Sequence, residues 1–186
     1  MSGVTHSRTS QIIDLPIEEV WKFVTVPANW IKLGLGTWKV HGSGGEDDLE
    51  AVNRTMQPGE HFLEYMHMKD RFDFVGDWVV TVCEAPHKWG FKSAHWHGHA
   101  LPVDIEATYT LEKLGENQTR WSRHRVNTPR PGKESKIDFL AGKNDLEEEY
   151  QQVTKQYLEK GIPKQPPHNP TPPHEAGWIE TLPVDA

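Results

Sequence analysis

Three histidines alternate with other residues along the segment His95-Trp96-His97-Gly98-His99. Side chains two positions apart in a β-strand point to the same face, so a strand through this segment would place three imidazoles side by side. Histidine titrates near neutral pH and also binds metal ions. The segment therefore predicts a proton-transfer site or a metal site, provided that this face of the strand lines an interior.

The metal alternative has little further support in the sequence. His95 and His97 have a spacing found in zinc sites, but such sites usually need a third protein ligand. We find no cysteine or carboxylate with a predicted position on the same face of the sheet. We therefore assign no metal ligand and expect no cofactor, and metal-assisted hydrolysis remains the least favoured alternative.

The composition argues against several classes of protein. The chain has 186 residues and a net charge of −7, with basic and acidic residues intermixed, so no basic face for nucleic acid is expected. The single cysteine, Cys83, fits a reducing compartment. No stretch approaches the roughly 18 continuous apolar residues that span a bilayer. We expect a cytoplasmic protein without a membrane span, and a homodimer remains open.

Hydrophobic periodicity and turn-forming residues predict the order of the elements. A first strand near residues 4–13 is followed by two short helices, one between Pro16 and Pro27 and one over 27–33. A long helix is predicted over 145–160, with an alternative start between Lys133 and Leu140. The remaining strands are expected near 37–41, 60–69, 72–84, 87–97, 103–114 and 118–127.

The end of the chain differs in character from the rest. Residues 162–186 are rich in proline, which predicts an extended tail, although Trp178 and Ile179 could still dock on the body. We therefore expect one domain over 1–161. Residues 42–59 form a glycine-rich acidic loop, and the acidic run 147–149 is expected to face solvent.

Two segments carry a family resemblance. Residues 14–24 read DLPIEEVWKFV and are followed at 27–30 by PANW, while residues 57–60 read QPGE and precede a strand with the sequence WVVTVCEAPHKW at 78–89. Both segments resemble the START-like (SRPBCC) superfamily, especially its polyketide cyclase/dehydrase-like members. The predicted order of elements is also that of the helix-grip architecture.

The resemblance implies an α+β helix-grip fold, in which a curved seven-stranded antiparallel sheet wraps around a long C-terminal helix, with two short helices after the first strand. It also implies a ligand cavity between the sheet and that helix. No universal catalytic residue follows, because members of the superfamily include cyclases, dehydratases, hydrolases and carriers of hydrophobic ligands. The site must be sought in this sequence.

In this architecture the apolar face of each strand is also the cavity face, so alternation predicts which residues line it. On strand 103–112 the alternation points Tyr109 inward. On strand 72–84 it points Cys83 outward, which argues against a cysteine nucleophile. On strand 87–97 the phase of Trp89 carries His95 and His97 inward, and His99 as well if no bulge intervenes at Gly98.

On strand 118–127 the phase of Trp121 carries Arg123 and Arg125 inward, although the opposite phase stays open. Proton transfer in an apolar chamber would suit enolisation or dehydration, with histidine as base and tyrosine or arginine stabilising the enolate oxygen. The predicted catalytic residues are His95, His97, Tyr109 and Arg123. The predicted substrate-binding residues are Phe74, Trp78, Trp89, Phe91, Trp121, Arg125, Tyr150 and Tyr157.

The function that these residues predict is a cofactor-independent cyclase, dehydratase or isomerase acting on a hydrophobic aromatic or polyketide-like molecule. The alternative is a non-catalytic carrier or sensor of such a molecule. Each residue also has a structural explanation: the histidines and arginines could lie on a solvated face, and Tyr109 could be a core residue with its hydroxyl satisfied.

Overall fold

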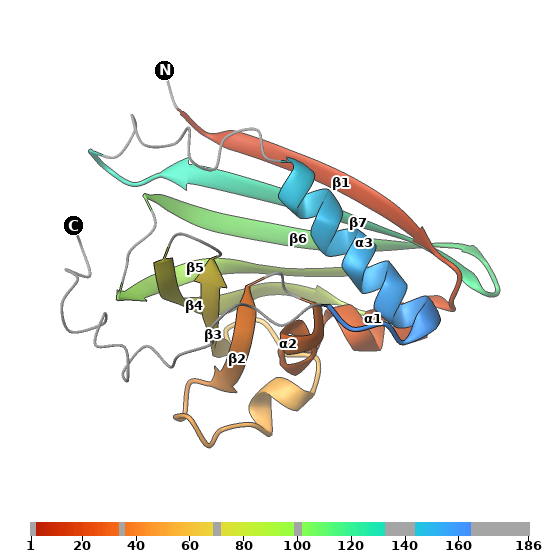
Figure 1. The fold of residues 1–186 in the computed structure, drawn as a ribbon, viewed down its shortest axis with the longest axis horizontal. Coiled ribbons are helices and arrows are strands. Elements are labelled where there is room, and N and C mark those ends of the chain that lie inside the picture. Colours follow the sequence, from red (N-terminus) through yellow and green to blue (C-terminus); the bar gives the residue numbers. More distant parts are fainter. Residues whose placement is uncertain (1–2, 34–35, 69–71, 99–101, 133–143, 165–186) are drawn as a thin grey trace.

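A seven-stranded antiparallel sheet forms the body of the molecule, and the helices pack on one of its faces (Figure 1). The computed structural model describes residues 3–33, 36–68, 72–98, 102–132 and 144–164. The strands follow the order β1-β7-β6-β5-β4-β3-β2, so β2 to β7 form a meander and β1 joins its last strand. Their bounds are β1 Thr5–Ile13, β2 Thr37–Gly42, β3 His61–Met68, β4 Phe72–Glu84, β5 Lys88–Gly98, β6 Val103–Gly115 and β7 Gln118–Pro129.

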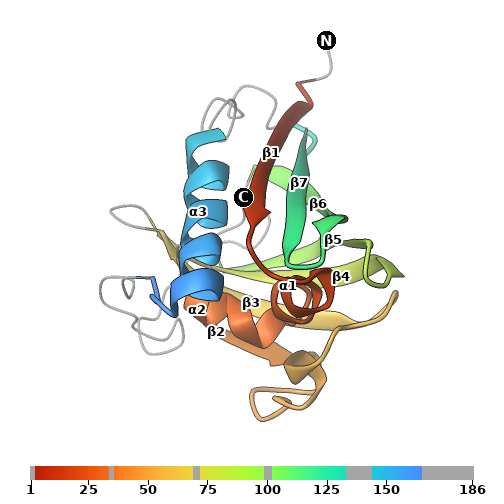
Figure 2. The same cartoon turned by 90° about the vertical axis from the view of Figure 1, so that its right-hand side faces the viewer.

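Two of the helices follow β1, and a longer one ends the described chain. The long helix α3 contacts β1 and α2, and Figure 2 shows it standing beside the curved sheet. This arrangement confirms the predicted helix-grip fold. No helix in the described ranges is both long and apolar enough to cross a membrane. The helices are α1 Ile17–Val24, α2 Trp30–Leu33 and α3 Asn144–Lys160, with 3-10 turns η1 Pro27–Asn29 and η2 Ala51–Asn53.

Local sequence explains where the helices begin and end. Pro16 precedes α1, and Glu18 and Glu19 lie in its first turn, where carboxylates interact favourably with the helix dipole. Gly161 follows the last residue of the long helix, adopts a positive φ of 66° and donates its backbone N–H to the carbonyl of Tyr157 over 2.8 Å. A glycine is favoured there because this left-handed conformation strains other residues.

Aromatic side chains fill the face of the sheet that carries the helices, which we call the inner face. Phe91 lies at the centre of this cluster, with ring centroids 5.3 Å from Trp78, 5.2 Å from Trp89 and 5.7 Å from Tyr109. Trp30 of α2 packs on Phe91 from the helix layer. Edge-to-face contacts of this kind add to the hydrophobic gain from burying large rings.

A bulge interrupts the alternation of β5. Asp77 of β4 pairs with His95, but the next residue, Trp78, pairs with Ser93, so Ala94 is an extra residue on β5. An extra residue reverses the faces of all side chains beyond it. As a result Trp96 lies on the inner face, only 2% exposed, with its Nε1–H donating to the Val103 carbonyl over 3.1 Å.

Some predictions concern residues outside the described part of the chain. These are the orientation of His99, the alternative helix start within 133–140, and the tail beyond Lys164 with Trp178 and Ile179. The side chain of Phe74 also lies outside the description, although its backbone belongs to β4.

Candidate functional site

Two tyrosines from opposite layers meet in the interior. Tyr109 lies on β6 and Tyr150 on α3, and their hydroxyl oxygens are 3.3 Å apart. Both side chains are buried, and burial raises the pKa of each tyrosine. Both hydroxyls therefore stay protonated at neutral pH. Either can donate a hydrogen bond to a ligand oxygen.

Arg123 lies beside this tyrosine pair. Its guanidinium carbon is 5.7 Å from the ring centroid of Tyr109 and 4.9 Å from that of Tyr150. The inward phase predicted for β7 is therefore correct, and Trp121 on the same phase is fully buried. Arg123 supplies a fixed positive charge at the aromatic wall of the interior.

Arg123 and Arg125 of β7 both form ion pairs with Glu147 of α3. The Glu147 side chain retains only 3% exposure, whereas the two arginine side chains retain 14% and 12%. Burial, together with the charge of Arg123, lowers the pKa of Arg125 to about 10. The prediction that the acidic run 147–149 faces solvent is wrong at Glu147, because this residue lies on the helix face that meets the sheet.

A buried carboxyl group, Glu64 of β3, faces the same interior. It is 6% exposed, accepts a hydrogen bond from Trp78 Nε1 over 3.0 Å, and is also bonded to the hydroxyl of Thr37. Burial raises the pKa of Glu64, and those hydrogen bonds with the charges of Lys164 and Arg123 partly offset the rise. The sequence did not assign Glu64 a face, because an acid on the apolar phase of a strand goes against the ordinary pattern.

Lys164, which follows α3, lies close to Glu64 and Thr37. Its Nζ donates to the backbone carbonyl of Thr37 over 2.6 Å. Burial lowers the pKa of Lys164 to about 8, and the charge of Glu64 opposes that shift. The contact ties the segment after α3 to the edge strand β2.

Several buried polar atoms of the interior lack a hydrogen-bond partner among the described residues. They include the indole Nε1 of Trp121, the guanidinium Nε of Arg123 and the amide oxygen Oε1 of Gln151. Gln151 uses its other polar atom, Nε2, to donate to the Trp121 carbonyl over 3.2 Å. Buried polar groups are usually satisfied, so these atoms offer donors and an acceptor to a bound molecule or water.

The predicted substrate-binding aromatics occupy two places. Trp78, Trp89, Phe91 and Trp121 form the buried wall of the inner face, as predicted. Tyr157 instead packs in the helix layer, where its ring lies 5.0 Å from that of Phe23. It is therefore separate from the tyrosine pair at Tyr109.

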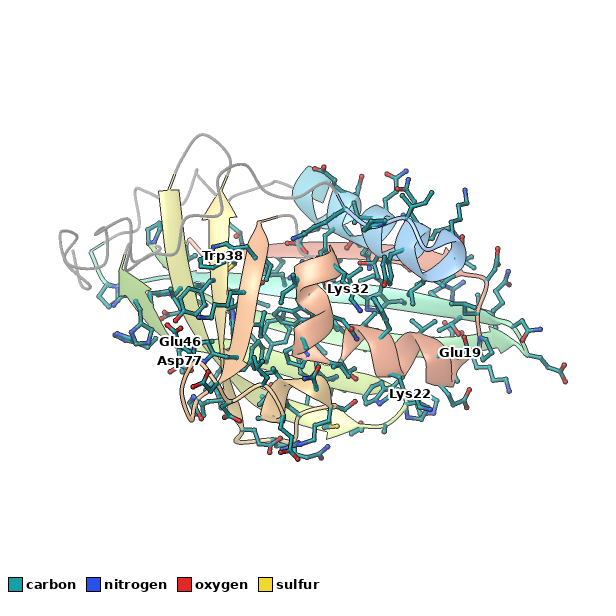
Figure 3. The ribbon with its side chains drawn as sticks, turned by 60° about the horizontal axis from the view of Figure 1, so that its bottom comes forward. Glu19, Lys22, Lys32, Trp38, Glu46 and Asp77 are labelled. Atoms are coloured by element: carbon teal, nitrogen blue, oxygen red, sulfur yellow. The ribbon has the colours of Figure 1, made fainter. Side chains whose placement is uncertain are left out.

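The prediction that His95 and His97 point into the interior is wrong. The bulge at Ala94 places both on the outer face of the sheet, where His95 is exposed and the two rings lie 4.7 Å apart. Asp77, which pairs with His95, is also on this face and lies well away from α3 (Figure 3). Partial burial and then the charge of His95 lower the pKa of His97, which Asp77 opposes.

The outer face also holds His61, whose Nδ1 lies 3.0 Å from the carboxylate of Asp77. Among the described residues no three histidine, cysteine, aspartate or glutamate side chains are placed to hold a metal ion.

The chemically capable side chains that the structure does bring together lie on the inner face. They are Tyr109, Tyr150, Arg123, Arg125, Glu147 and Glu64.

Comparisons with known proteins agree on the fold. No family model and no curated protein matches the sequence. Among solved structures, DynU16 from the dynemicin biosynthetic locus has a TM-score of 0.56 at 20% identity, over 85% of this chain and 48% of that one. The di-domain ARO/CYC StfQ of the steffimycin pathway has a TM-score of 0.59 at 13% identity, over 83% of this chain and 44% of that one.

Norcoclaurine synthase of Thalictrum flavum has a TM-score of 0.59 at 9% identity, over 85% of this chain and 96% of that one. The chain thus spans about half the length of DynU16 and StfQ and nearly all of the synthase. At these identities the likeness concerns the fold, and it confirms the helix-grip architecture that the START-like resemblance implies.

Proposed function

Starting from a helix-grip fold, we propose that the protein binds a hydrophobic aromatic or polyketide-like molecule against its inner face and catalyses proton transfer on it, as a cyclase, dehydratase or isomerase. The observation that carries this proposal is the pair of buried hydroxyls of Tyr109 and Tyr150 beside the guanidinium of Arg123. The fold neighbour StfQ is a di-domain ARO/CYC protein, which supports a cyclase-type role.

The tyrosine pair suits a carbonyl substrate. When a proton leaves the carbon beside a carbonyl group, negative charge develops on the carbonyl oxygen. Donors that are already in position stabilise this oxygen best, because a dry site needs no reorganisation at that moment. The hydroxyls of Tyr109 and Tyr150 would donate to the oxygen, and Arg123 would stabilise its charge.

Glu64 is the proposed proton acceptor. Its raised pKa makes it more basic than an exposed glutamate, and its bonds to Thr37 and Trp78 fix its orientation. The carbon–hydrogen bond breaks, the carboxylate takes the proton, and the same carboxyl group returns a proton to carbon or to a leaving hydroxyl. Glu64 of the inner face thus takes the proton-transfer role that the sequence analysis gave to His95 and His97.

The proposal can be tested with the probe ketone 2-tetralone, which enolises into conjugation with its aromatic ring. Incubation with the full chain in D2O should accelerate exchange of its α-protons, measured by the loss of their NMR signals. Tyr150→Phe or Tyr109→Phe should slow this catalysed exchange by about 10²-fold, as expected for loss of one oxyanion donor. Glu64→Gln should abolish it.

The matched control is the double variant His95→Gln/His97→Gln, which alters the outer face only and should exchange the ketone at the parent rate. The result that overturns the proposal is the reverse pattern, in which the histidine variant loses the exchange and the tyrosine and Glu64 variants keep it. Circular dichroism and thermal melts establish that each variant is folded before its rate is compared.

One observation favours a carrier as the second candidate. Both carboxylate oxygens of Glu64 already have partners, and so do the terminal nitrogens of Arg123 and Arg125 that pair with Glu147. Groups engaged in this way could orient a ligand without reacting with it. A carrier would bind 2-tetralone saturably, quenching tryptophan fluorescence, while its α-protons exchange at the rate measured without protein.

A further inference from the structure

A hollow of about 590 Å³ lies on the outer face of the sheet, over strands β1, β5, β6 and β7. We call it the outer-face hollow. Seven of the nine residues that line it alternate along their strands with inward-facing residues such as Tyr109 and Trp121, and the other two, Thr9 and Arg123, belong to the inner phase. Of the residues that line it, the proposed function uses only Arg123.

Strand register arranges the floor of the hollow in two rows that cross the sheet. In the first row Ser10 of β1 pairs with Ser122 of β7, Ser122 with Thr110 of β6, and Thr110 with Lys88 of β5. All four residues line the hollow. Three neighbouring hydroxyls thus lead from β1 to a lysine on β5.

The second row runs beside the first. Arg8 of β1 pairs with His124 of β7, and His124 pairs with Thr108 of β6. These three residues also line the hollow. The two rows together place a basic residue at each side of the hollow, Arg8 and Lys88, with hydroxyls and an imidazole between them.

The charge of the hollow differs from that of the protein as a whole. The chain carries a net charge of −7, but no aspartate or glutamate is among the residues that line the hollow. Glu106 is the acid whose charge raises the pKa of His124, and it lies opposite Lys92 in the register of β5 and β6. The hollow is therefore basic and rich in hydrogen-bond donors.

We propose that the outer-face hollow binds the phosphate group of a small soluble molecule. A guanidinium matches a phosphate with two parallel hydrogen bonds, and lysine acts on it as a point charge. The hydroxyls of Ser10 and Thr110 supply further donors, while that of Ser122 donates to Ser10 over 3.2 Å. The volume falls in the range of small-molecule sites and exceeds what a bare phosphate needs, which favours a phosphate ester as the occupant.

His124 gives this site a titratable reporter. Partial burial and the charges of Arg8 and His6 lower its pKa, and Glu106 opposes them. Lys88 lines the same hollow from β5. A phosphate dianion between Arg8 and Lys88 would favour the charged imidazole and so raise the pKa of His124.

The test is a titration of the full chain with inorganic phosphate, followed by NMR at constant ionic strength. Phosphate should shift the amide signals of Ser10, Thr110 and Ser122 and raise the pKa read from the His124 ring protons. Arg8→Gln should weaken binding by about tenfold, the loss expected for one hydrogen bond to a charged group. The charge-matched control is Lys22→Gln on α1 (Figure 3), which is not among the residues that line the hollow and should bind as the parent does.

Further variants and probes distinguish specific phosphate binding from screening by salt and from binding to a lipid surface. Arg8→Lys keeps the charge but loses the planar fork, so it should weaken binding even if the glutamine variant does not fold. Equal shifts with sodium chloride, or equal loss in R8Q and K22Q, would mean screening by salt and would overturn the proposal. Binding to phosphatidylcholine vesicles that contain phosphatidic acid, without any binding of inorganic phosphate, would also overturn it.

Discussion

The two faces of the sheet hold their carboxyl groups in opposite ways. On the inner face Glu64 and Glu147 are almost fully buried and bonded to Thr37, Trp78 and two arginines. On the outer face the exposed His95 meets Asp77 across the strands, and the two side chains of the His61–Asp77 pair are 39% and 23% exposed. Desolvation raises the pKa of the buried carboxyl group of Glu64.

A single residue decides which face the histidines occupy. Ala94 is the extra residue at the β4–β5 register shift, and beyond it the tryptophan at position 96 points inward in place of the histidines. Exchanging two imidazoles for an indole favours the fold, because the indole buries more apolar area and its N–H finds an acceptor. The four predictions below test this contrast between the faces.

The largest effect is expected at the residue that the bulge turns inward. Trp96→Ala removes a buried indole that packs edge-to-face on Trp78 with ring centroids 5.4 Å apart, so we expect a loss of about 4 kcal/mol in the free energy of unfolding. Urea denaturation measures it. The neighbouring His95→Ala, on the exposed face, should change stability by less than about 0.5 kcal/mol; similar losses for both variants would mean that the bulge is absent.

The next effect is expected at Glu147. Replacing it with alanine leaves the largely buried guanidinium groups of Arg123 and Arg125 without their carboxylate, which should destabilise the fold by about 3 kcal/mol in urea denaturation. The matched control is Glu112→Ala, which removes an exposed ion pair with Arg120 and should cost less than about 1 kcal/mol. Equal losses would contradict the burial of the inner pair.

Glu64→Gln should produce a smaller effect that depends on pH. Because burial raises the folded-state pKa of Glu64, the parent protein loses stability as the pH rises above the ordinary glutamate range and Glu64 ionises. The variant lacks this loss, so its melting temperature should exceed that of the parent at neutral pH and match it in acid.

The control for this pH dependence is Glu60, which accepts two hydrogen bonds from Arg54 that lower its pKa. Its contribution has the opposite sign: the stability it provides is lost as the pH falls through its folded-state pKa. Glu60→Gln should therefore lower the melting temperature at neutral pH and converge with the parent in acid. A Glu64 variant with the same sign as Glu60→Gln would exclude a raised pKa at Glu64.

The smallest effect is expected for the histidine pair. His95→Gln/His97→Gln should change the free energy of unfolding by less than about 0.5 kcal/mol at neutral pH, because both side chains lie on the outer face. Thermal melts at two pH values measure this. A loss above 2 kcal/mol would mean that the pair is part of the packed interior after all.

Most of the fold was predictable because its strands alternate cleanly and end at strong turn formers. The strand predicted over 72–84 is β4 Phe72–Glu84, and the helix predicted over 145–160 is α3 Asn144–Lys160. Tyr109 and Arg123 were correctly turned inward by the same alternation. Local periodicity suffices wherever one face of an element is buried without interruption.

The rest of the site depends on contacts between distant segments. Nothing local marks Ala94 as a bulge, because its position follows from how β5 matches β4. Glu64 and Glu147 resemble ordinary solvated acids in sequence, and only the approach of Trp78 and Arg123 makes their burial tolerable. One sequence signal could have pointed to the site: Glu64 is an acid at a strand position where the alternation predicts an inward-facing apolar residue.

The position of β1 in the sheet has a consequence for synthesis of the chain. Thr5 pairs with Asn127, so β1 finds its partner only after about 120 further residues, up to the end of β7, have been translated. At about 5–20 residues per second this interval is on the order of ten seconds. The first seven residues of β1, Thr5 to Gln11, are all polar. The nascent chain thus exposes a strand with little tendency to aggregate while it waits for β7.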